Sequence, residues 1–339
     1  MIRSVLFFSL LMVQVACGGA QQTAQTVERA TEIPQEPSPS VPSPTESEAA
    51  HFSSPELDSQ FQILPNGKAL SSIKVSGSSL YLAKGTGDAF TSAKQQSYLA
   101  LKNATLQQPE HKVRWAIMDL DSGQMLAQSL SAHRRIFGAS SSKIYVAGTL
   151  LHVRQGSLST SQLQKMADML VVSSNSAWTA LQQEIGGGSA DKGRQLNYEF
   201  TQGLGHSETR GFQGYWGDMH GNELVASETV DFLYDVYWGR FAGAEYLWKL
   251  MYTCRTGGSR GRKYIPKYVH VGAKTGTYDG PTENPDTGAN YQDKIRNHVI
   301  TVNVNGRQYG VAVFANSGSD EDVALLVGGL LREYTGMKD

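Results

Sequence analysis

The chain has 339 residues, of which 40% are hydrophobic and 18% are charged, and its formal net charge is −1. This is an ordinary globular composition, and the length allows one large domain or two modest ones. A net charge near zero gives no electrostatic basis for binding nucleic acid, so we expect no nucleic-acid partner.

The N-terminus has the organisation of an export signal. One cation, Arg3, precedes the apolar stretch Val5–Val13, which is too short to span a bilayer and is placed like the core of a signal peptide. We therefore expect residues 1–16 to be a signal peptide that directs export of the chain.

The residues that follow resemble the lipobox of bacterial lipoproteins, in which a cysteine becomes the acylated first residue. Here Val15-Ala16 precedes Cys17, whereas Gln14 stands where that pattern prefers leucine. Ordinary cleavage after residues 18–20 is therefore the alternative. The resemblance implies a periplasmic or cell-envelope protein that is anchored to a membrane through lipidated Cys17.

A polar segment separates this N-terminus from the folded part. Residues 17–60 are rich in Pro, Ser, Thr and Glu and bury too little apolar area to offset chain entropy, so we expect a disordered tether. Residues 61–92 carry short apolar groups between glycines and serines, and the sequence assigns them no role. The folded domain is expected to span residues 93–339.

Cysteine and histidine usage gives no support for a metal site or a disulfide. If Cys17 is lipidated or removed, Cys254 is a lone thiol. The eight histidines are scattered, and we expect His133, His152, His206 and His220 to be structural or exposed rather than metal ligands. We therefore expect neither a metal nor another cofactor.

Strand patterns lie at both ends of the folded part, and helical patterns lie between them. The predicted elements are, in order, a helix over 93–108, strands over 113–120 and 125–128, helices within 144–250, strands over 269–277, 298–304 and 309–315, and a helix over 320–334. This order predicts an α/β (α+β) fold, in which an antiparallel sheet is built from both ends of the domain and flanked by helices. The helical insertion is expected at about 144–250.

A serine-rich turn at residues 138–142 leads directly into a helical pattern. A serine at a helix N-terminus lies where unpaired backbone N–H groups favour developing negative charge. Lys143 follows Ser140 by three residues, so it falls on the same helical face and within reach of the hydroxyl. This spacing is not specific by itself, because Ser71–Lys74 shares it without a following helix.

Two further motifs follow in a fixed order. Ser140-x-x-Lys143 is followed by Ser173-x-Asn175 and then by Lys274-Thr275-Gly276 on a predicted strand. The set resembles the signatures of the penicillin-recognising serine enzymes, which are the class A β-lactamases and the D,D-peptidase penicillin-binding proteins. The similarity runs from about residue 93 to the C-terminus and implies the β-lactamase and transpeptidase-like fold.

The resemblance implies roles for the residues around the nucleophile. Ser140 would be acylated after losing its proton to a base. Lys143 could be that base if burial and the second cation, Lys274, lower its pKa. Ser173 would relay the proton to the leaving group, and Asn175 would hold Lys143 and the substrate amide.

The resemblance also implies how the substrate would be bound. Lys274 and the hydroxyls of Thr275 and Thr277 would hold a substrate carboxylate. The backbone N–H groups of Ser140 and Thr277 would form the oxyanion hole. Gly276 would let the substrate lie along the strand.

Two departures from the family pattern bear on function. Ser140 and Ser173 are 33 positions apart, a shorter interval than is usual in class A enzymes, which predicts a reduced helical subdomain. Class A enzymes also place a glutamate soon after a Thr-Arg pair to activate the deacylating water. After Thr209-Arg210 the first acids are Asp218 and Glu223, and neither is in register. We therefore expect acylation by β-lactams to be easier than hydrolysis, unless Asp218 or Glu223 takes over.

These observations favour an exported active-site serine hydrolase or transferase that acts on a D-Ala-D-Ala-type peptide of peptidoglycan. One alternative is a class A-like β-lactamase that hydrolyses β-lactams. The other is a catalytically silent envelope-binding protein on the same fold.

Overall fold

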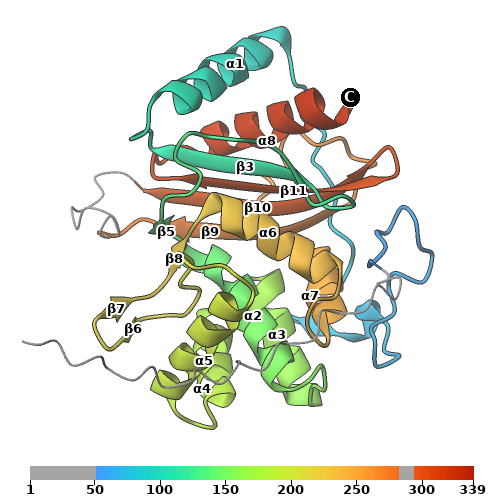
Figure 1. Cartoon of the computed structure of the whole chain (residues 1–339). Helices are drawn as coiled ribbons and strands as arrows, with labels where there is room; N and C mark the ends of the chain where they lie inside the picture. Colours follow the sequence, from blue (N-terminus) through green and yellow to red (C-terminus); the bar gives the residue numbers. More distant parts are fainter. Residues whose placement is uncertain (1–50, 282–293) are drawn as a thin grey trace, which may run out of the picture. The chain divides into compact units, whose positions relative to one another are not determined.

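Strands from distant parts of the sequence meet in one sheet. The computed structural model describes residues 51–281 and 294–339. Within them, five antiparallel strands pair in the order β4-β3-β11-β10-β9 (Figure 1). The strands are β3 (Val113–Asp119), β4 (Gln124–Gln128), β9 (Val271–Tyr278), β10 (Ile295–Val304) and β11 (Arg307–Ala315). The predicted antiparallel sheet, built from both ends of the domain, is confirmed.

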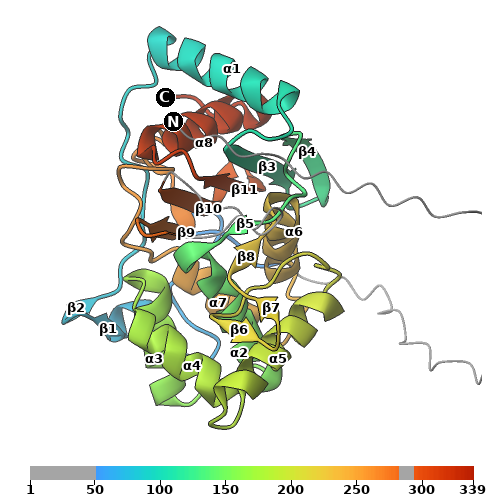
Figure 2. The same ribbon diagram turned by 90° about the vertical axis from the view of Figure 1, so that its left-hand side faces the viewer.

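Both faces of the sheet are covered by helices. The helices that pack on it are α1 (Ser92–Gln107), α6 (Ala226–Tyr237) and α8 (Asp320–Thr335). Figures 1 and 2 show α8 on one face, with α1 beyond it, and α6 on the other. Along β3, Trp115 and Ile117 enter the core beneath α8, whereas Ala116 and Met118 enter the core on the α6 side. β3 is buried on both faces, which explains why its sequence is almost continuously apolar.

The turn between β10 and β11 follows from its two residues. Asn305 and Gly306 have φ values of 55° and 81°. A two-residue hairpin turn of this kind requires positive φ at both positions, and Asn-Gly adopts it at low cost. This local signal sets the register of the long pair at the centre of the sheet.

The expected helical insertion connects β5 to β9. Its elements are η2 (Ala139–Ser142), α2 (Lys143–Val153), α3 (Thr160–Val171), α4 (Asn175–Ile185), α5 (Ala190–Gly203) and α7 (Ala244–Met251). Four short strands join them, β5 (Ile136–Phe137), β6 (Tyr215–Trp216), β7 (Met219–His220) and β8 (Glu223–Leu224). Serine side chains cap the N-termini of α3, α4 and α5, so three of these helices begin where local sequence directs.

The N-terminal boundary of the folded part differs from the expectation. Residues 51–60 belong to the packed structure rather than to a tether that ends near residue 60. The Phe52 N–H donates to the Tyr237 carbonyl oxygen at 2.8 Å, and Trp248 Nε1 donates to the Ser53 carbonyl oxygen at 2.8 Å. The sequence signal fails because residues 51–60 contribute only backbone atoms to these two bonds, which are therefore independent of the polar composition of the segment.

Residues 61–92, to which the sequence assigned no role, pack against the helical insertion and the edge of the sheet. The Phe61 ring lies 5.1 Å from the Tyr252 ring, and Lys249 Nζ donates to the Ile63 carbonyl oxygen at 2.5 Å. Lys84 forms an isolated β-bridge with His270, just before β9. Residues 61–92 thus contact the chain at the start of β9, the strand that carries Lys274.

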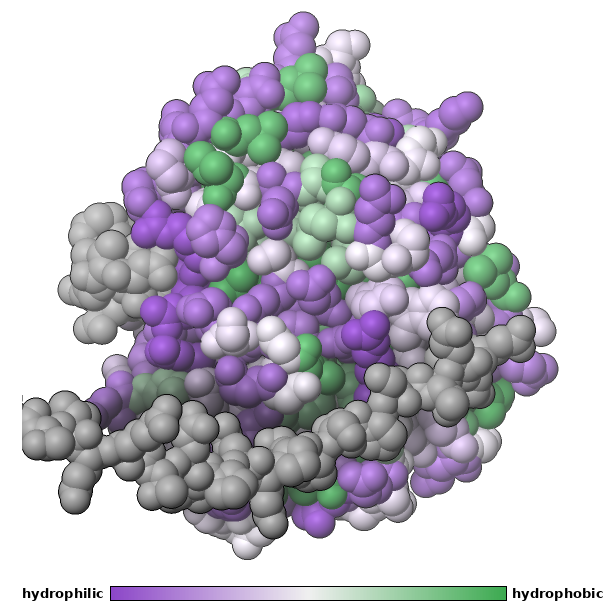
Figure 3. Space-filling view, in the orientation of Figure 1, coloured by the Kyte–Doolittle hydropathy of each residue, from purple (hydrophilic) through white to green (hydrophobic). Residues whose placement is uncertain are grey.

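The predicted signal peptide, Cys17 and the tether as far as residue 50 lie outside the described residues. In the ranges 51–281 and 294–339, no helix has the length and apolarity needed to cross a membrane. On the face drawn in Figure 3, apolar side chains lie in small groups among polar ones, as on most protein surfaces.

We expect Phe61→Ala to lower the free energy of unfolding by about 3–5 kcal/mol, because it empties a buried aromatic site. Phe61 is 1% exposed. Leu57→Ala is the matched control, since Leu57 is 55% exposed and should lose less than about 0.5 kcal/mol. Urea denaturation measures both, and equal small losses would show that the N-terminal segment is not part of the folded unit.

Candidate active site

The Ser140 turn joins strand β5 to the buried helix α2. Ser140 is half-buried, whereas residues 141–151 are buried. The preceding residue, Ala139, has a φ of 48°, in the left-handed region that alanine rarely adopts. This turn leaves the Ser140 side chain at the end of the helix and open to a cavity.

Lys143 lies at the centre of the polar contacts below Ser140. Its Nζ is 3.0 Å from Ser140 Oγ and 3.1 Å from Ser173 Oγ. It also donates to the Ser173 carbonyl oxygen at 2.6 Å and to Asn175 Oδ1 at 2.7 Å. The structure therefore brings together all four residues of the first two motifs.

Burial lowers the pKa of Lys143 to about 6, and the nearby Lys274 ammonium group acts in the same direction. The side chain is fully buried, and charging it there costs solvation energy. An uncharged amine has two N–H donors and one lone pair. The two carbonyl acceptors take the two N–H groups, which leaves the lone pair for the Ser140 and Ser173 hydroxyls. Lys143 can therefore accept a proton from Ser140.

Lys274 reaches the same site from strand β9. Its Nζ donates to Ser173 Oγ at 2.9 Å and to the Thr275 carbonyl oxygen at 2.8 Å. Burial lowers the pKa of Lys274 to about 8, and the Arg260 guanidinium also lowers it. The Ser173 hydroxyl thus connects two amines with lowered pKa values and can carry a proton between them.

Strand β9 can approach the Ser140 turn because residue 276 is glycine. A Cβ at Gly276 would lie 2.5 Å from the Gly138 carbonyl oxygen and 2.7 Å from Ser141 Oγ. Asn297, on the neighbouring strand β10, fastens the contact, since its Nδ2 donates to the carbonyl oxygens of Phe137 and Gly138 at 2.9 and 3.0 Å. The sheet and the Ser140 turn are therefore held directly against each other.

A cavity of about 250 Å³ opens beside Ser140. Asn175 and Thr277 line it, together with the aromatic side chains of Phe137, Trp178 and Tyr278. Its remaining lining residues are Ala139, Gln213, Gly214, His220, Gly221 and Asn222.

The Thr275 hydroxyl, which was expected to hold a substrate carboxylate, contacts another threonine of the protein. Its Oγ1 is 2.6 Å from Thr256 Oγ1, and the residue is only 6% exposed. Thr256 in turn contacts the buried Cys254 thiol at 3.2 Å. The Thr275 hydroxyl is therefore engaged inside the protein, unlike the exposed Thr277.

The two candidate deacylation acids are not among the residues that line the cavity. Asp218 lies exposed in the turn between β6 and β7. Glu223 is 3% exposed, and its Oε2 is bound by Arg210 at 3.0 Å and Arg135 at 3.4 Å. Arg210 and Glu223 also form a β-bridge. Glu223 therefore closes the base of the loop that carries Asp218.

No sequence motif singles out Asn297 or His220 as a site residue. Asn297 is a fully buried amide in β10, but Arg296 and His298 flank it, so its polarity does not stand out in the sequence. His220 lines the cavity, but its partner Glu223 becomes apparent only in the folded chain.

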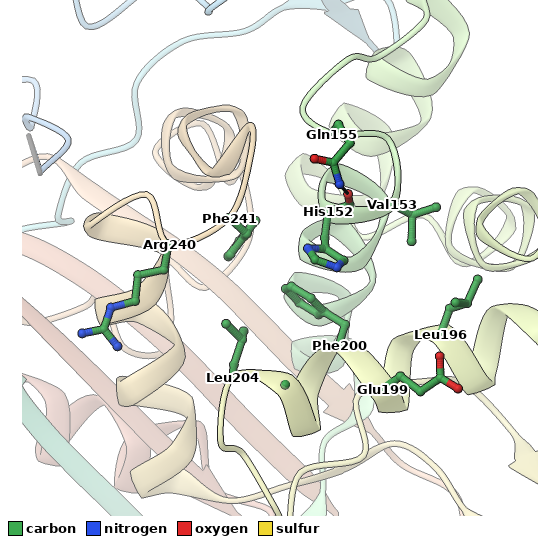
Figure 4. A pocket seen from close by; sticks show the side chains of 10 residues that line it. His152, Val153, Gln155, Leu196, Glu199, Phe200, Leu204, Arg240 and Phe241 are labelled. Carbon is green, nitrogen blue, oxygen red and sulfur yellow. Dashed lines mark hydrogen bonds between the residues drawn. The ribbon is translucent and has the colours of Figure 1, made fainter. Parts of the chain in front are cut away.

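A second hollow, of about 380 Å³, lies between α2, α5 and the loop after α6 (Figure 4). The His152 and Phe200 rings lie 5.2 Å apart, whereas the Arg240 side chain extends away from them and donates to Asp235 Oδ1 at 2.9 Å. None of the residues of the three motifs lines it. Among the described residues there is also no group of three or more His, Cys, Asp or Glu side chains that could hold a metal ion.

A family model described as "Beta-lactamase enzyme family" matches residues 153–330, more than half of the chain. The chain belongs to this family. The matched region contains Ser173, Asn175 and Lys274, while Ser140 and Lys143 precede it. No curated protein matches the sequence.

Solved β-lactamase structures share the fold of this family member. A β-lactamase from Xanthomonas campestris is 16% identical with a TM-score of 0.55, and the match covers 72% of this chain and 98% of that one. One from Chitinophaga pinensis is 17% identical with a TM-score of 0.53, covering 72% and 98%. One from Streptosporangium roseum is 16% identical with a TM-score of 0.53, covering 73% and 100%. The predicted β-lactamase and transpeptidase-like fold is confirmed.

We expect Gly276→Ala to lower the free energy of unfolding by about 1–3 kcal/mol, because the added methyl group would overlap the rigid Gly138 carbonyl oxygen. Gly203→Ala is the matched control. It lies in α5 with no atom within 4 Å of the new methyl group, so it should be neutral or slightly stabilising. Urea denaturation measures both, and a neutral Gly276→Ala would contradict the close packing of β9 on the turn.

Proposed function

We propose that the protein is an exported active-site serine hydrolase or transferase whose Ser140 is acylated by D-Ala-D-Ala-type peptides of peptidoglycan. Membership of the β-lactamase family supports acyl-serine chemistry in general. The identity of the nucleophile, its helpers and the substrate is our inference from the site.

The observation that carries the proposal is the set of partners around Lys143. Its two N–H groups have acceptor-only partners, so the lone pair remains for the Ser140 hydroxyl at 3.0 Å. With a pKa of about 6, the amine is uncharged at neutral pH. Lys143 then removes the Ser140 proton as the hydroxyl oxygen attacks the substrate carbonyl carbon. Ser173 passes that proton to the leaving nitrogen.

Charge and donors on β9 support the choice of substrate. Lys274 supplies a buried positive charge, and Thr277 supplies an exposed hydroxyl on the cavity side of the same strand. Both a D-Ala-D-Ala terminus and a β-lactam carry a carboxylate close to the amide bond that is cleaved. The N–H groups of Ser140 and Thr277 serve as the oxyanion hole.

Localisation and domain limits belong to the same proposal. Residues 1–16 are a signal peptide, and the lipidated Cys17 anchors a tether. The catalytic domain begins near residue 51 rather than 93, because residues 51–92 pack on the helices and the sheet.

We favour a peptidase over a β-lactamase because none of the described residues lining the cavity carries a carboxylate. Hydrolysis of β-lactams is the second candidate function. The names of the solved structures that this chain resembles favour it. One of them is L2 complexed with relebactam, which is 14% identical with a TM-score of 0.54.

The test is labelling with a fluorescent penicillin. We expect a covalent adduct that survives removal of the excess label, that does not form in Ser140→Ala and that still forms in Ser141→Ala, because Ser141 Oγ is buried and has no hydrogen-bond partner. Rapid turnover of nitrocefin by the unmodified protein would instead support the β-lactamase. Absence of any adduct would support a non-catalytic binding protein.

The acylation rate should depend on pH with a bell-shaped profile. It should rise as Lys143 loses its proton, with a pKa of about 6, because only the neutral amine acts as a base. It should fall as Lys274 loses its proton, with a pKa of about 8, because the carboxylate then loses its cation. Stopped-flow acylation measures both limbs.

The control for this profile is Lys274→Arg. Arginine stays charged over this pH range, so the alkaline limb should disappear while the acid limb remains. An unchanged alkaline limb in the variant would assign that limb to another group.

A further inference from the structure

His220 is the one imidazole among the described residues that line the Ser140 cavity. An imidazole nitrogen with a free lone pair can take a proton from water, as a general base must. The loop that carries His220 follows the Thr-Arg pair, where class A enzymes hold their deacylating acid. This loop therefore supplies a possible base of a different kind.

Glu223 orients the His220 ring. Its Oε1 is 3.2 Å from His220 Nδ1, while its Oε2 is held by Arg210 and Arg135. A carboxylate paired with two guanidinium groups only accepts hydrogen bonds, so Nδ1 must carry the proton. In a neutral imidazole, Nε2 then has the free lone pair.

Aromatic rings and strand pairing fix the position of His220 relative to the nucleophile. The Phe137 ring is stacked against it at 6.4 Å, and the Tyr215 ring lies 4.8 Å away. Phe137 pairs with Glu223 between β5 and β8, three residues before Ser140. The Gly138 N–H also donates to the Asn222 carbonyl oxygen at 2.7 Å. The segment with the histidine and the segment with the serine are thus one hydrogen-bonded unit.

We propose that His220, oriented by Glu223, is the general base for hydrolysis of the acyl-Ser140 ester. The proposal rests on acylation of Ser140. His220 Nε2 takes a proton from water as the water oxygen bonds to the ester carbonyl carbon. The tetrahedral intermediate then collapses, the bond from carbon to Ser140 Oγ breaks, and the proton on Nε2 passes to that oxygen. The products are a carboxylic acid and the free Ser140 hydroxyl.

Several charged or titratable groups surround this histidine. Glu223 faces it from β8, with Arg210 and Arg135 behind the carboxylate, and Tyr215 faces it from β6. Lys143 Nζ lies 3.0 Å from Ser140 Oγ. Two arginines occupy the other oxygen of Glu223, so His220 is the member of this group that lines the cavity and has a lone pair for water.

The experiment separates acylation from deacylation. The protein is labelled with a fluorescent penicillin, excess label is removed, and loss of the adduct is followed with time. We expect His220→Gln to acylate within about threefold of the unmodified rate and to lose the adduct about 100-fold more slowly, which is the size of a general-base contribution. His152→Gln is the matched control, because His152 is an exposed histidine at the second hollow (Figure 4) and should leave both rates unchanged.

Two further readouts distinguish a base from a structural role. In the unmodified protein, deacylation should accelerate with rising pH as the imidazole loses its proton, and this limb should be absent in His220→Gln. Free imidazole should partly restore deacylation in His220→Ala. A pH-independent deacylation rate in the unmodified protein would overturn the proposal without any variant.

The remaining outcomes are also decisive. An adduct on His220→Gln that decays at the unmodified rate overturns the role of His220 and leaves the Ser140 proposal standing. If the unmodified protein forms no adduct at all, the proposed function fails and the role of His220 fails with it.

Discussion

The structure depends on one buried amine that is held against one hydroxyl. Lys143 can be fully buried because two carbonyl acceptors and two hydroxyls surround its Nζ. Removing such a group from water favours its neutral form, and the second amine, Lys274, adds to the effect. The fold must therefore bring the end of a helix and an edge strand to the same point. Gly276 allows that approach, and Asn297 holds it.

Backbone strain gathers at this point. Ala139, Ser173 and Asn222 all have positive φ values, of 48°, 63° and 60°, although none is glycine. At alanine and serine this conformation costs about 1–3 kcal/mol and persists only where the surrounding structure fixes it, whereas asparagine adopts it more readily. Here the fixing contacts are identifiable, because Ser173 is bound by both lysines and Asn222 accepts from the Gly138 N–H and the Ser142 hydroxyl. These conformations place the Ser140 and Ser173 hydroxyls beside the Lys143 amine and Asn222 in the wall of the adjoining cavity.

Glu223 has surroundings in the folded chain that its residue type does not specify. As one of the first acids after the Thr-Arg pair, it is a candidate to activate water directly. In the folded chain it is 3% exposed and bound by Arg210, Arg135 and His220. A carboxylate with that many donors is a fixed acceptor, so it anchors the loop and sets the tautomer of the histidine. Of these two residues, His220 lines the cavity and Glu223 does not.

The sequence by itself determined the elements and the motif residues. Periodicity, serine caps and the Asn305-Gly306 turn are local signals, and Ser140, Lys143, Ser173, Asn175 and Lys274 were each identified from order and spacing. Only the tertiary structure decided that residues 51–60 pack on the domain, that Thr275 turns to Thr256, and that Asp218 lies away from the cavity. The physical reason is that burial, ion pairing and lowered pKa values arise from contacts between residues far apart in the chain, and no local pattern specifies those contacts.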